Sequence, residues 1–305
     1  MGPQARYRRA AMATRSIINR AGPRSVALET TLLVHGVPRD AARPLAAELA
    51  GIVRGHGAEP VYIGVVSGQP VVGLTDEELG LLLDAPSVPK ANTANLGVLM
   101  HWGTHAATTV SATMELGAAA GVRVFATGGL GGVHPDLGCH LDISSDLAAF
   151  TRFPMAVVTA GVKSLLDVEG TREALETLGV PVIGFRTDRF PAFYLRESSA
   201  TVDARFDDEA VLASFVNAEL ARTGRGVVVA NPIPQADEIQ SADWERWLEQ
   251  AEELAEAAGV QGRDVTPFIL GRLHSLSGGA TLRANLALIR SNAALAGTLA
   301  ALMES

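Results

Sequence analysis

Short, almost wholly apolar segments alternate with amphipathic helical segments along most of this 305-residue chain. A strand that is apolar on both faces fits a parallel sheet covered by helices on both sides, because a sheet with one wet face would alternate apolar and polar residues. The sequence therefore predicts an α/β fold, a three-layer α/β/α sandwich with a mainly parallel central sheet. The predicted strands span residues 25–28, 61–66, 71–72, 122–126, 155–159, 180–184 and 227–229.

The predicted helices lie between and after these strands. The clearest start signal is the capping-box spacing of Thr75 and Glu78, a pattern typical of a helix N-terminus. Helices are expected at residues 40–55, 75–83, 108–120, 145–150, 171–178, 208–222, 236–258, 266–276 and 282–303. No linker-like composition divides the chain, so we expect a single catalytic domain over residues 24–305, preceded by an irregular basic lead-in over residues 1–23.

Composition excludes several classes of protein. The net charge is −8 and no basic cluster follows the N-terminal segment, so we expect no nucleic-acid partner, because such a footprint is basic. No apolar stretch approaches the roughly 18 residues of a membrane span, and residues 1–20 lack the apolar core of a secretory signal. Cys139 is the single cysteine, which excludes structural disulfides within the chain and favours a cytoplasmic location.

The choice of basic residues is unusual. Of 25 basic residues only Lys90 and Lys163 are lysines, and the others are arginines. A lysine amine can lose its proton and act as a nucleophile or form a Schiff base, whereas a guanidinium stays protonated. The two lysines are therefore candidates for chemistry, with chance survival in an arginine-rich composition as the alternative.

Several polar groups follow predicted strands directly. Ligands of parallel sheets bind at the carboxyl ends of the strands, and Glu29, Lys163 and Asn231 each lie at or just past such an end. The segment 127–134 also follows a strand and has four glycines in the five positions 128–132. This loop matches neither the dinucleotide nor the Walker pattern. It predicts either close approach of the backbone to a ligand or a tight turn.

A metal site is a further possibility after the glycine-rich loop. His134, His140 and Asp142 lie within nine residues, and Asp146 adds a second carboxylate. Oxygen-rich loop ligands suit a hard divalent ion that keeps several waters. Spacing alone favours the structural alternative, in which Asp142 or Ser144 caps a helix and the histidines are solvated.

A series of ordered sequence blocks carries a family resemblance. They are VALETT at 26–31, HGVP at 35–38, VGLTDEEL at 72–79, ATTVSATM at 107–114, RVFATGGLGGVH at 123–134, DISSDL at 142–147, AGVKSLLD at 160–167, DRFPAFY at 188–194, NPIP at 231–234, TPF at 266–268 and ANLAL at 284–288. In this order the blocks resemble the pseudouridine-5′-phosphate glycosidase family, from about residue 24 to the end of the chain.

The resemblance implies an α/β/α homotrimer that uses a divalent metal, typically Mn²⁺. It implies chemistry at the C–C bond between C1′ of ribose 5-phosphate and a planar base or acceptor. By position, Glu29 is the proton donor, Lys163 the covalent nucleophile and Asp142 the metal ligand. The positions matched to substrate contacts are Lys90, Thr109, Val110, His134, Ser144, Ser145, Asp146 and Asn285.

The chemistry of a C-glycoside explains these residue types. Ordinary glycoside cleavage protonates a leaving oxygen, but the leaving carbon of a C-glycoside has no lone pair to protonate. Protonation of the ring oxygen O4′ by Glu29 opens the ribose instead and exposes C1′ to an amine. An imine with Lys163 is then an electron sink for the C–C bond. Glu29 needs a raised pKa to hold its proton near neutrality, and burial supplies that shift.

Departures from the family pattern leave the direction and acceptor open. The family's Ser-Arg-Arg-Asp run after the first lysine is Asn92-Thr93-Ala94-Asn95 here, and the Asn-Pro-Ile-Pro motif is followed by Gln235-Ala236 instead of glutamates. Catalytic positions kept among altered neighbours favour a C-glycosynthase of specialised metabolism, for example antibiotic biosynthesis. The alternative is a pseudouridine-5′-phosphate glycosidase, and a remote one is a non-catalytic sugar-phosphate binding protein.

Overall fold

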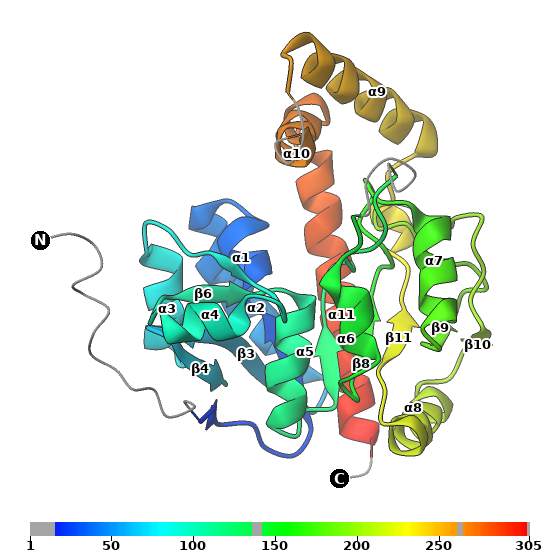
Figure 1. Ribbon diagram of the computed structural model, residues 1–305. Helices are drawn as coiled ribbons and strands as arrows, with labels where there is room; N and C mark the ends of the chain where they lie inside the picture. Colours follow the sequence, from blue (N-terminus) through cyan, green and yellow to red (C-terminus); the bar gives the residue numbers. More distant parts are fainter. Residues whose placement is uncertain (1–15, 136–141, 261–264, 304–305) are drawn as a thin grey trace, which may run out of the picture.

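The computed structural model describes residues 16–135, 142–260 and 265–303, and these residues form an 11-stranded sheet (Figure 1). The path of the sheet is β1-β4-β3-β2-β7-β8-β11-β9-β10, with β6 paired to β3 and β5 paired to β6. The strands are β1 (Ile18–Asn19), β2 (Ser25–Glu29), β3 (Glu59–Val66), β4 (Gln69–Val72), β5 (Lys90–Ala91), β6 (Ala106–Thr108), β7 (Val124–Ala126), β8 (Ala156–Thr159), β9 (Val182–Phe185), β10 (Ala204–Phe206) and β11 (Val227–Ala230). All pairings are parallel except those of β3 with β4 and β6.

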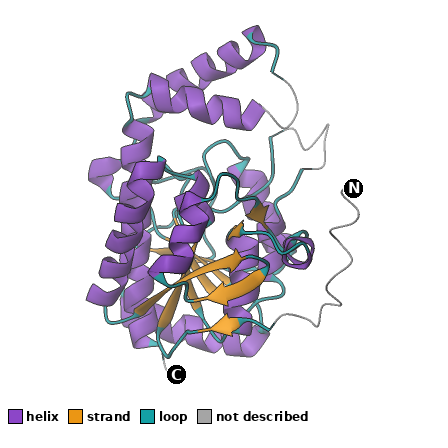
Figure 2. Cartoon of the chain, turned by 90° about the vertical axis from the view of Figure 1, so that its left-hand side faces the viewer, coloured by secondary structure: helices purple, strands orange, loops and turns teal. Residues whose placement is uncertain are grey.

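Helices cover both faces of this sheet (Figure 2). One face carries α2, α8 and α11, and the other carries α5 and α6. The helices are α1 (Thr31–His35), α2 (Arg39–Gly55), α3 (Asp76–Asp84), α4 (Leu96–His101), α5 (Val110–Ala119), α6 (Ser145–Phe150), α7 (Val168–Thr177), α8 (Glu209–Thr223), α9 (Ser241–Ala257), α10 (Val265–Leu276) and α11 (Ala280–Leu302). The predicted three-layer, mainly parallel, single-domain α/β fold is confirmed.

Alternate residues of the central strands enter two separate cores. Val124 and Ala126 pack with the helices of the α11 face, whereas Phe125 between them packs with those of the α5 face. Strands β8 and β11 divide in the same way, because successive side chains of a strand point to opposite faces. Both faces are apolar and buried, which is why the sequence shows continuous apolar runs at these strands.

Short elements differ from the sequence prediction. The helix expected over 108–120 begins only at Val110, because Thr108 belongs to β6, which pairs with Gly64–Val65 of β3. The expected helix over 236–258 begins at Ser241, after a 3-10 turn at Gln235–Asp237. Part of the expected irregular lead-in is also ordered, since β1 pairs with Val71–Val72 at the edge of the sheet.

Helices α9 and α10 project beyond the sheet, and α11 returns from them along its face (Figure 1). Helix α11 has 23 residues and contacts β2, β7 and β8 as well as α2 and α8. No helix among the described residues is long and apolar enough to span a membrane.

Candidate active site

The candidate site lies where β2, β7 and β8 end, near the middle of the sheet. Glu29 is the last residue of β2, Thr127 follows β7, and Lys163 follows β8 by four residues. Since these three strands are neighbours and parallel, their carboxyl ends meet at one edge, as the sequence predicts. Lys90, the first residue of β5, interacts electrostatically with both Glu29 and Lys163.

Glu29 is a buried carboxyl group with one hydrogen-bond donor. Its side chain is in a residue only 7% exposed, and Thr127 Oγ1 donates to Glu29 Oε1 over 2.5 Å. Burial raises the pKa of Glu29, and the nearby Asp146 raises it further, while Lys163, Thr127 and Lys90 oppose the shift. The net direction is upward, so the site favours a protonated carboxyl, the form that a proton donor requires.

Lys163 is held against the glycine-rich loop by its backbone. Its N–H donates to the carbonyl of Leu130 over 3.1 Å, and the N–H of Leu130 donates to Gly161 over 2.8 Å. A Cβ at Gly129 would lie 3.3 Å from Lys163 Cγ and 2.5 Å from Phe193 Cδ2. Only glycine lets these two side chains lie so close to the loop. The glycine-rich loop is therefore approached closely by two of the chain's own side chains, and its approach to a ligand stays a prediction.

Lys90 is the second cation of the site. Partial burial lowers its pKa, the positive charge of Lys163 lowers it further, and Glu29 opposes both effects. The side chain keeps contact with solvent. His35 is also affected by this cation, since burial and then Lys90 lower its pKa.

A cluster of hydroxyl groups lies where α5 and α6 begin. Ser111 Oγ is 3.0 Å from Ser145 Oγ and 3.2 Å from Thr109 Oγ1. The backbone N–H of Thr93 approaches Ser111 Oγ at 3.4 Å. Three predicted or neighbouring contact positions thus come together beside two helix N-termini, where backbone N–H groups favour an anion.

Asp146 is hydrogen-bonded both to this hydroxyl cluster and to the glycine-rich loop. It is 5% exposed, its Oδ1 accepts from the N–H of Ser111 over 3.0 Å, and its Oδ2 accepts from the N–H of Gly131 over 2.9 Å. Ser144 caps α6 by accepting from the N–H of Asp146. Both carboxylate oxygens are thus occupied by the protein, so the structure gives Asp146 a positioning role that sequence reasoning did not foresee.

Two other predicted substrate contacts, Val110 and Asn285, offer a ligand a backbone group and a side-chain oxygen, respectively. The Val110 side chain is buried in the core at 1% exposure, so a ligand there can meet only its backbone at the start of α5. Asn285 on α11 lies beside the loop, with Oδ1 3.5 Å from the place of a Cβ on Gly128. Asn285 Oδ1 and Ser164 Oγ are buried and have no hydrogen-bond partner among the described residues, and both acceptors are free for a ligand.

Asp142 and His134 define the candidate metal position. Asp142 is exposed, and its Oδ2 lies 3.7 Å from His134 Nε2. His140, the third predicted candidate, lies outside the described residues. Within the described part of the chain, no group of three potential ligands surrounds a common point. A single carboxylate fits a hard ion that keeps most of its water shell, and among the described residues Asp142 is suited to such an ion.

Sequence reasoning singled out Asn231 but missed its partner Asn292, with which it forms a buried amide pair behind the site. Asn231 Nδ2 donates to Asn292 Oδ1 over 2.9 Å, and Asn292 Nδ2 donates to the carbonyl of Thr127 over 2.7 Å. Asn292 is fully buried on α11. The signal for it was present, because it occupies a position of the apolar stripe formed with Leu288, Leu295 and Leu299.

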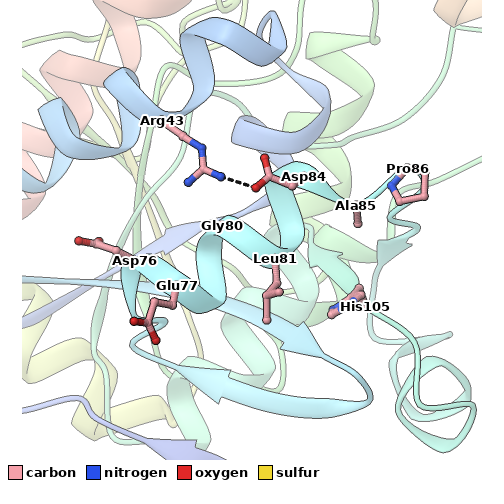
Figure 3. Close-up of a pocket in the computed structure, with 9 residues that line it drawn as sticks. All are labelled: Arg43, Asp76, Glu77, Gly80, Leu81, Asp84, Ala85, Pro86 and His105. Atoms are coloured by element: carbon pink, nitrogen blue, oxygen red, sulfur yellow. Dashed lines mark hydrogen bonds and ion pairs between the residues drawn. The ribbon is translucent and has the colours of Figure 1, made fainter.

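A surface hollow of about 770 Å³ lies apart from these residues, over α3 (Figure 3). Asp76, Glu77 and Asp84 line it together with Arg43, and Arg43 is paired with Asp84 at 2.6 Å. None of the predicted site residues lines this hollow. Its excess of carboxylates does not suit an anionic sugar phosphate.

Comparisons with known proteins show which family the chain belongs to. The family model described as "Indigoidine synthase A like protein" matches residues 16–302. A protein named pseudouridine-5′-phosphate glycosidase from Methylobacterium nodulans is 47% identical to this chain, over 92% of this chain and 83% of its own. One from Nocardioides is 45% identical over 92% of both chains.

Solved structures show the same fold. The prealnumycin C-glycosynthase AlnA, crystallised with ribulose 5-phosphate, has a TM-score of 0.85 and 36% identity over 92% of this chain and 91% of its own. An indigoidine synthase A-like protein from Thermotoga maritima has a TM-score of 0.84 and 36% identity over 96% and 98%. The chain therefore belongs to the family of indigoidine synthase A-like proteins, which includes the pseudouridine-5′-phosphate glycosidases that its motifs resemble.

Proposed function

We propose that this protein is an enzyme that forms or breaks the C–C bond between C1′ of ribose 5-phosphate and a planar acceptor, through an imine on Lys163. The observation that carries the proposal is the buried Glu29 with its raised pKa, in electrostatic contact with Lys163 and Lys90. An acid that keeps its proton next to an amine is the pair needed for ring opening followed by imine formation.

The steps follow from this pair. Glu29 gives its proton to O4′, the C1′–O4′ bond breaks, and C1′ becomes electrophilic. The unprotonated amine of Lys163 adds to C1′, and loss of water from the sugar's free aldehyde leaves the imine. A carbon nucleophile of the acceptor then adds to C1′, and the hydrogen that it loses goes to the amine nitrogen. The O4′ hydroxyl attacks C1′, the amine of Lys163 leaves with the O4′ proton, and Glu29 takes back the proton that the C1′ hydroxyl released when the aldehyde formed. Cleavage is the reverse sequence.

The direction we favour is synthesis, as a C-glycosynthase acting on an aromatic or heterocyclic acceptor other than uracil. The segment Asn92–Asn95 supports this choice. The N–H of Thr93 reaches the hydroxyl cluster at Ser111, and Asn95 Nδ2 donates to the carbonyl of Lys90 over 3.0 Å. The family's two arginines are thus replaced by neutral groups next to a residue of the site, which changes what the neighbouring wall can bind.

A second candidate is cleavage of pseudouridine 5′-phosphate to uracil and ribose 5-phosphate. The observation that favours it is the identity of 41–47% with relatives that carry the glycosidase name. The C-glycosynthase AlnA is 36% identical. A simple activity measurement separates the two candidates. Purified protein with Mn²⁺, ribose 5-phosphate and uracil should make little pseudouridine 5′-phosphate, and turnover of about 1–1,000 per second would establish the glycosidase instead.

Asp142 is the residue that would hold a divalent ion, with Mn²⁺ as our choice and His134 beside it. Such an ion would supply positive charge for the phosphate or acceptor. A homotrimer in the cytoplasm remains our prediction for the assembly and its location, and light scattering of the purified protein measures the first.

Trapping of the imine tests the chemistry itself. Borohydride reduces an imine to a stable amine, so ribose 5-phosphate should become attached once per chain, on the peptide that contains Lys163. Lys163→Arg should abolish the adduct, because guanidinium cannot serve as the amine. Lys90→Arg should weaken binding and retain some adduct. Attachment at Lys90, or no adduct with an active enzyme, would refute the mechanism, and binding without any turnover would restore the non-catalytic alternative.

A further inference from the structure

The Asn231-Pro232-Ile233-Pro234 motif has no part in the proposed chemistry. Its asparagine is nevertheless buried, and hydrogen bonds through a second amide, that of Asn292, connect it to the site. Asn231 follows β11, and its backbone N–H donates to Thr159 of β8 over 2.8 Å. Its side chain donates to Ser291 Oγ over 3.0 Å and to Asn292 Oδ1 over 2.9 Å. Asn231 therefore joins the end of the sheet to the middle of α11.

Asn292 continues the connection to the proton donor. Its Nδ2 donates to the carbonyl of Thr127 over 2.7 Å, and the Thr127 hydroxyl donates to Glu29 Oε1. Asn292 and Thr127 are both fully buried. At Thr127 the chain leaves β7, so this carbonyl has passed the last pair of the strand ladder. Without Asn292 it would be a buried acceptor with no donor, which is costly.

The two amides therefore determine how the peptide after Thr127 is oriented, and with it where the Thr127 hydroxyl lies. We infer that Asn231 and Asn292 are positioning residues for Glu29: through Thr127 they keep one carboxyl oxygen occupied and leave the other to carry the transferable proton. The inference rests on the proposed function, because Glu29 is a proton donor only in that reaction. The hydrogen bonds from which it is argued do not depend on that function. Of the residues Asn231, Asn292 and Thr127, it is Thr127 that hydrogen-bonds the acid directly.

The charges around Glu29 indicate the sign of the effect. Lys163 and Lys90 favour its ionised form, Asp146 disfavours it, and the hydrogen bond from Thr127 favours it. A loosened Thr127 hydroxyl therefore raises the pKa of Glu29 further while it leaves the carboxyl less well oriented. Misplacement of a catalytic group by about 1 Å can reduce a rate about 100-fold.

The test replaces Asn292 by leucine, which is similar in size and cannot donate. In Asn292→Leu we expect imine trapping at Lys163 to slow by about 10- to 100-fold, with KM for ribose 5-phosphate unchanged. Infrared difference titration of the carboxyl band, assigned with Glu29→Gln, should show an upward shift of the Glu29 titration. Asn231→Ala should do the same to a smaller degree, and adding it to Asn292→Leu should change little more.

Leu299→Ala is the matched control, since it removes core packing from the same helix without touching either amide. It should lower the melting temperature and leave the Glu29 titration and the trapping rate as they are. An unchanged titration in folded Asn292→Leu, or an equal shift in Leu299→Ala, would overturn the inference. Failure of the wild-type protein to form an adduct would instead overturn the proposed function, and the infrared titration would still decide the role of the amides.

Discussion

Asp146 is the residue for which a role in substrate contact and a role in the scaffold predict the most different effects on stability. Family resemblance assigns it to substrate, whereas the structure engages both of its oxygens with backbone N–H groups, at Ser111 and Gly131. We expect Asp146→Ala to destabilise the fold itself. A residue that contacts only substrate would leave the free energy of unfolding unchanged.

The magnitude follows from the two bonds. A hydrogen bond to a charged acceptor contributes about 1.5–3 kcal/mol, and of the two N–H groups left behind, that of Ser111 belongs to a fully buried residue. Loss of both bonds therefore costs about 3–6 kcal/mol, a large part of the roughly 5–15 kcal/mol by which domains are stable. Asp146→Asn keeps one acceptor oxygen and should lose about half as much.

Urea unfolding at neutral pH measures this loss, and Asp208 provides the control. Asp208 also accepts from two backbone N–H groups, those of Ala210 and Val211 at the start of α8, but it is exposed. Asp208→Ala should therefore cost only about 1 kcal/mol, as helix caps do. If Asp146→Ala unfolds with the same free energy as Asp208→Ala or the wild type, the scaffold role of Asp146 is wrong.

Three further predictions address other parts of the site. Burial raises the pKa of Glu29, so its contribution to stability is present at acid pH and is lost as pH rises through the folded-state pKa; Glu29→Gln should therefore gain stability relative to wild type above that pH in urea titrations, and parallel curves would contradict burial of the neutral acid. Asp142→Ala should abolish Mn²⁺ binding followed by electron paramagnetic resonance, with melting unchanged, and retained binding would place the ion elsewhere. Gly129→Ala should nearly eliminate trapping at Lys163, because its Cβ would lie 2.5 Å from Phe193 Cδ2; full trapping would mean that the loop yields.

The central strands were predictable, whereas the short strands β6 and β10 were not. β8 and β11 are continuous apolar runs in the middle of the sheet, where both faces need apolar residues. β10 is a three-residue edge strand with mostly exposed side chains, so no burial pattern marks it. β6 resembles the start of the helix that follows it, and only its pairing with β3 makes it a strand.

In the candidate site, the types of residue could be predicted from the sequence, but their arrangement in space could not. The scarcity of lysine in the sequence is enough to single out Lys90 and Lys163, and the fold brings both into electrostatic contact with Glu29. The occupation of Asp146 by two N–H groups could not be predicted, because it depends on α5 and the glycine-rich loop meeting at one side chain. Asn292 could have been suspected from a lone amide within an apolar helical stripe.

The position of α11 in the chain sets the order in which the reactive pair can be completed during synthesis. Glu29, Thr127 and Lys163 all leave the ribosome before this helix, which carries Asn292 and covers the ends of β2, β7 and β8. Contacts between such distant segments form late, because they must close long loops. A nascent chain thus has its acid and its amine but no rigid frame between them. If the proposed function holds, the frame around Glu29 and Lys163 is complete only once α11 has docked.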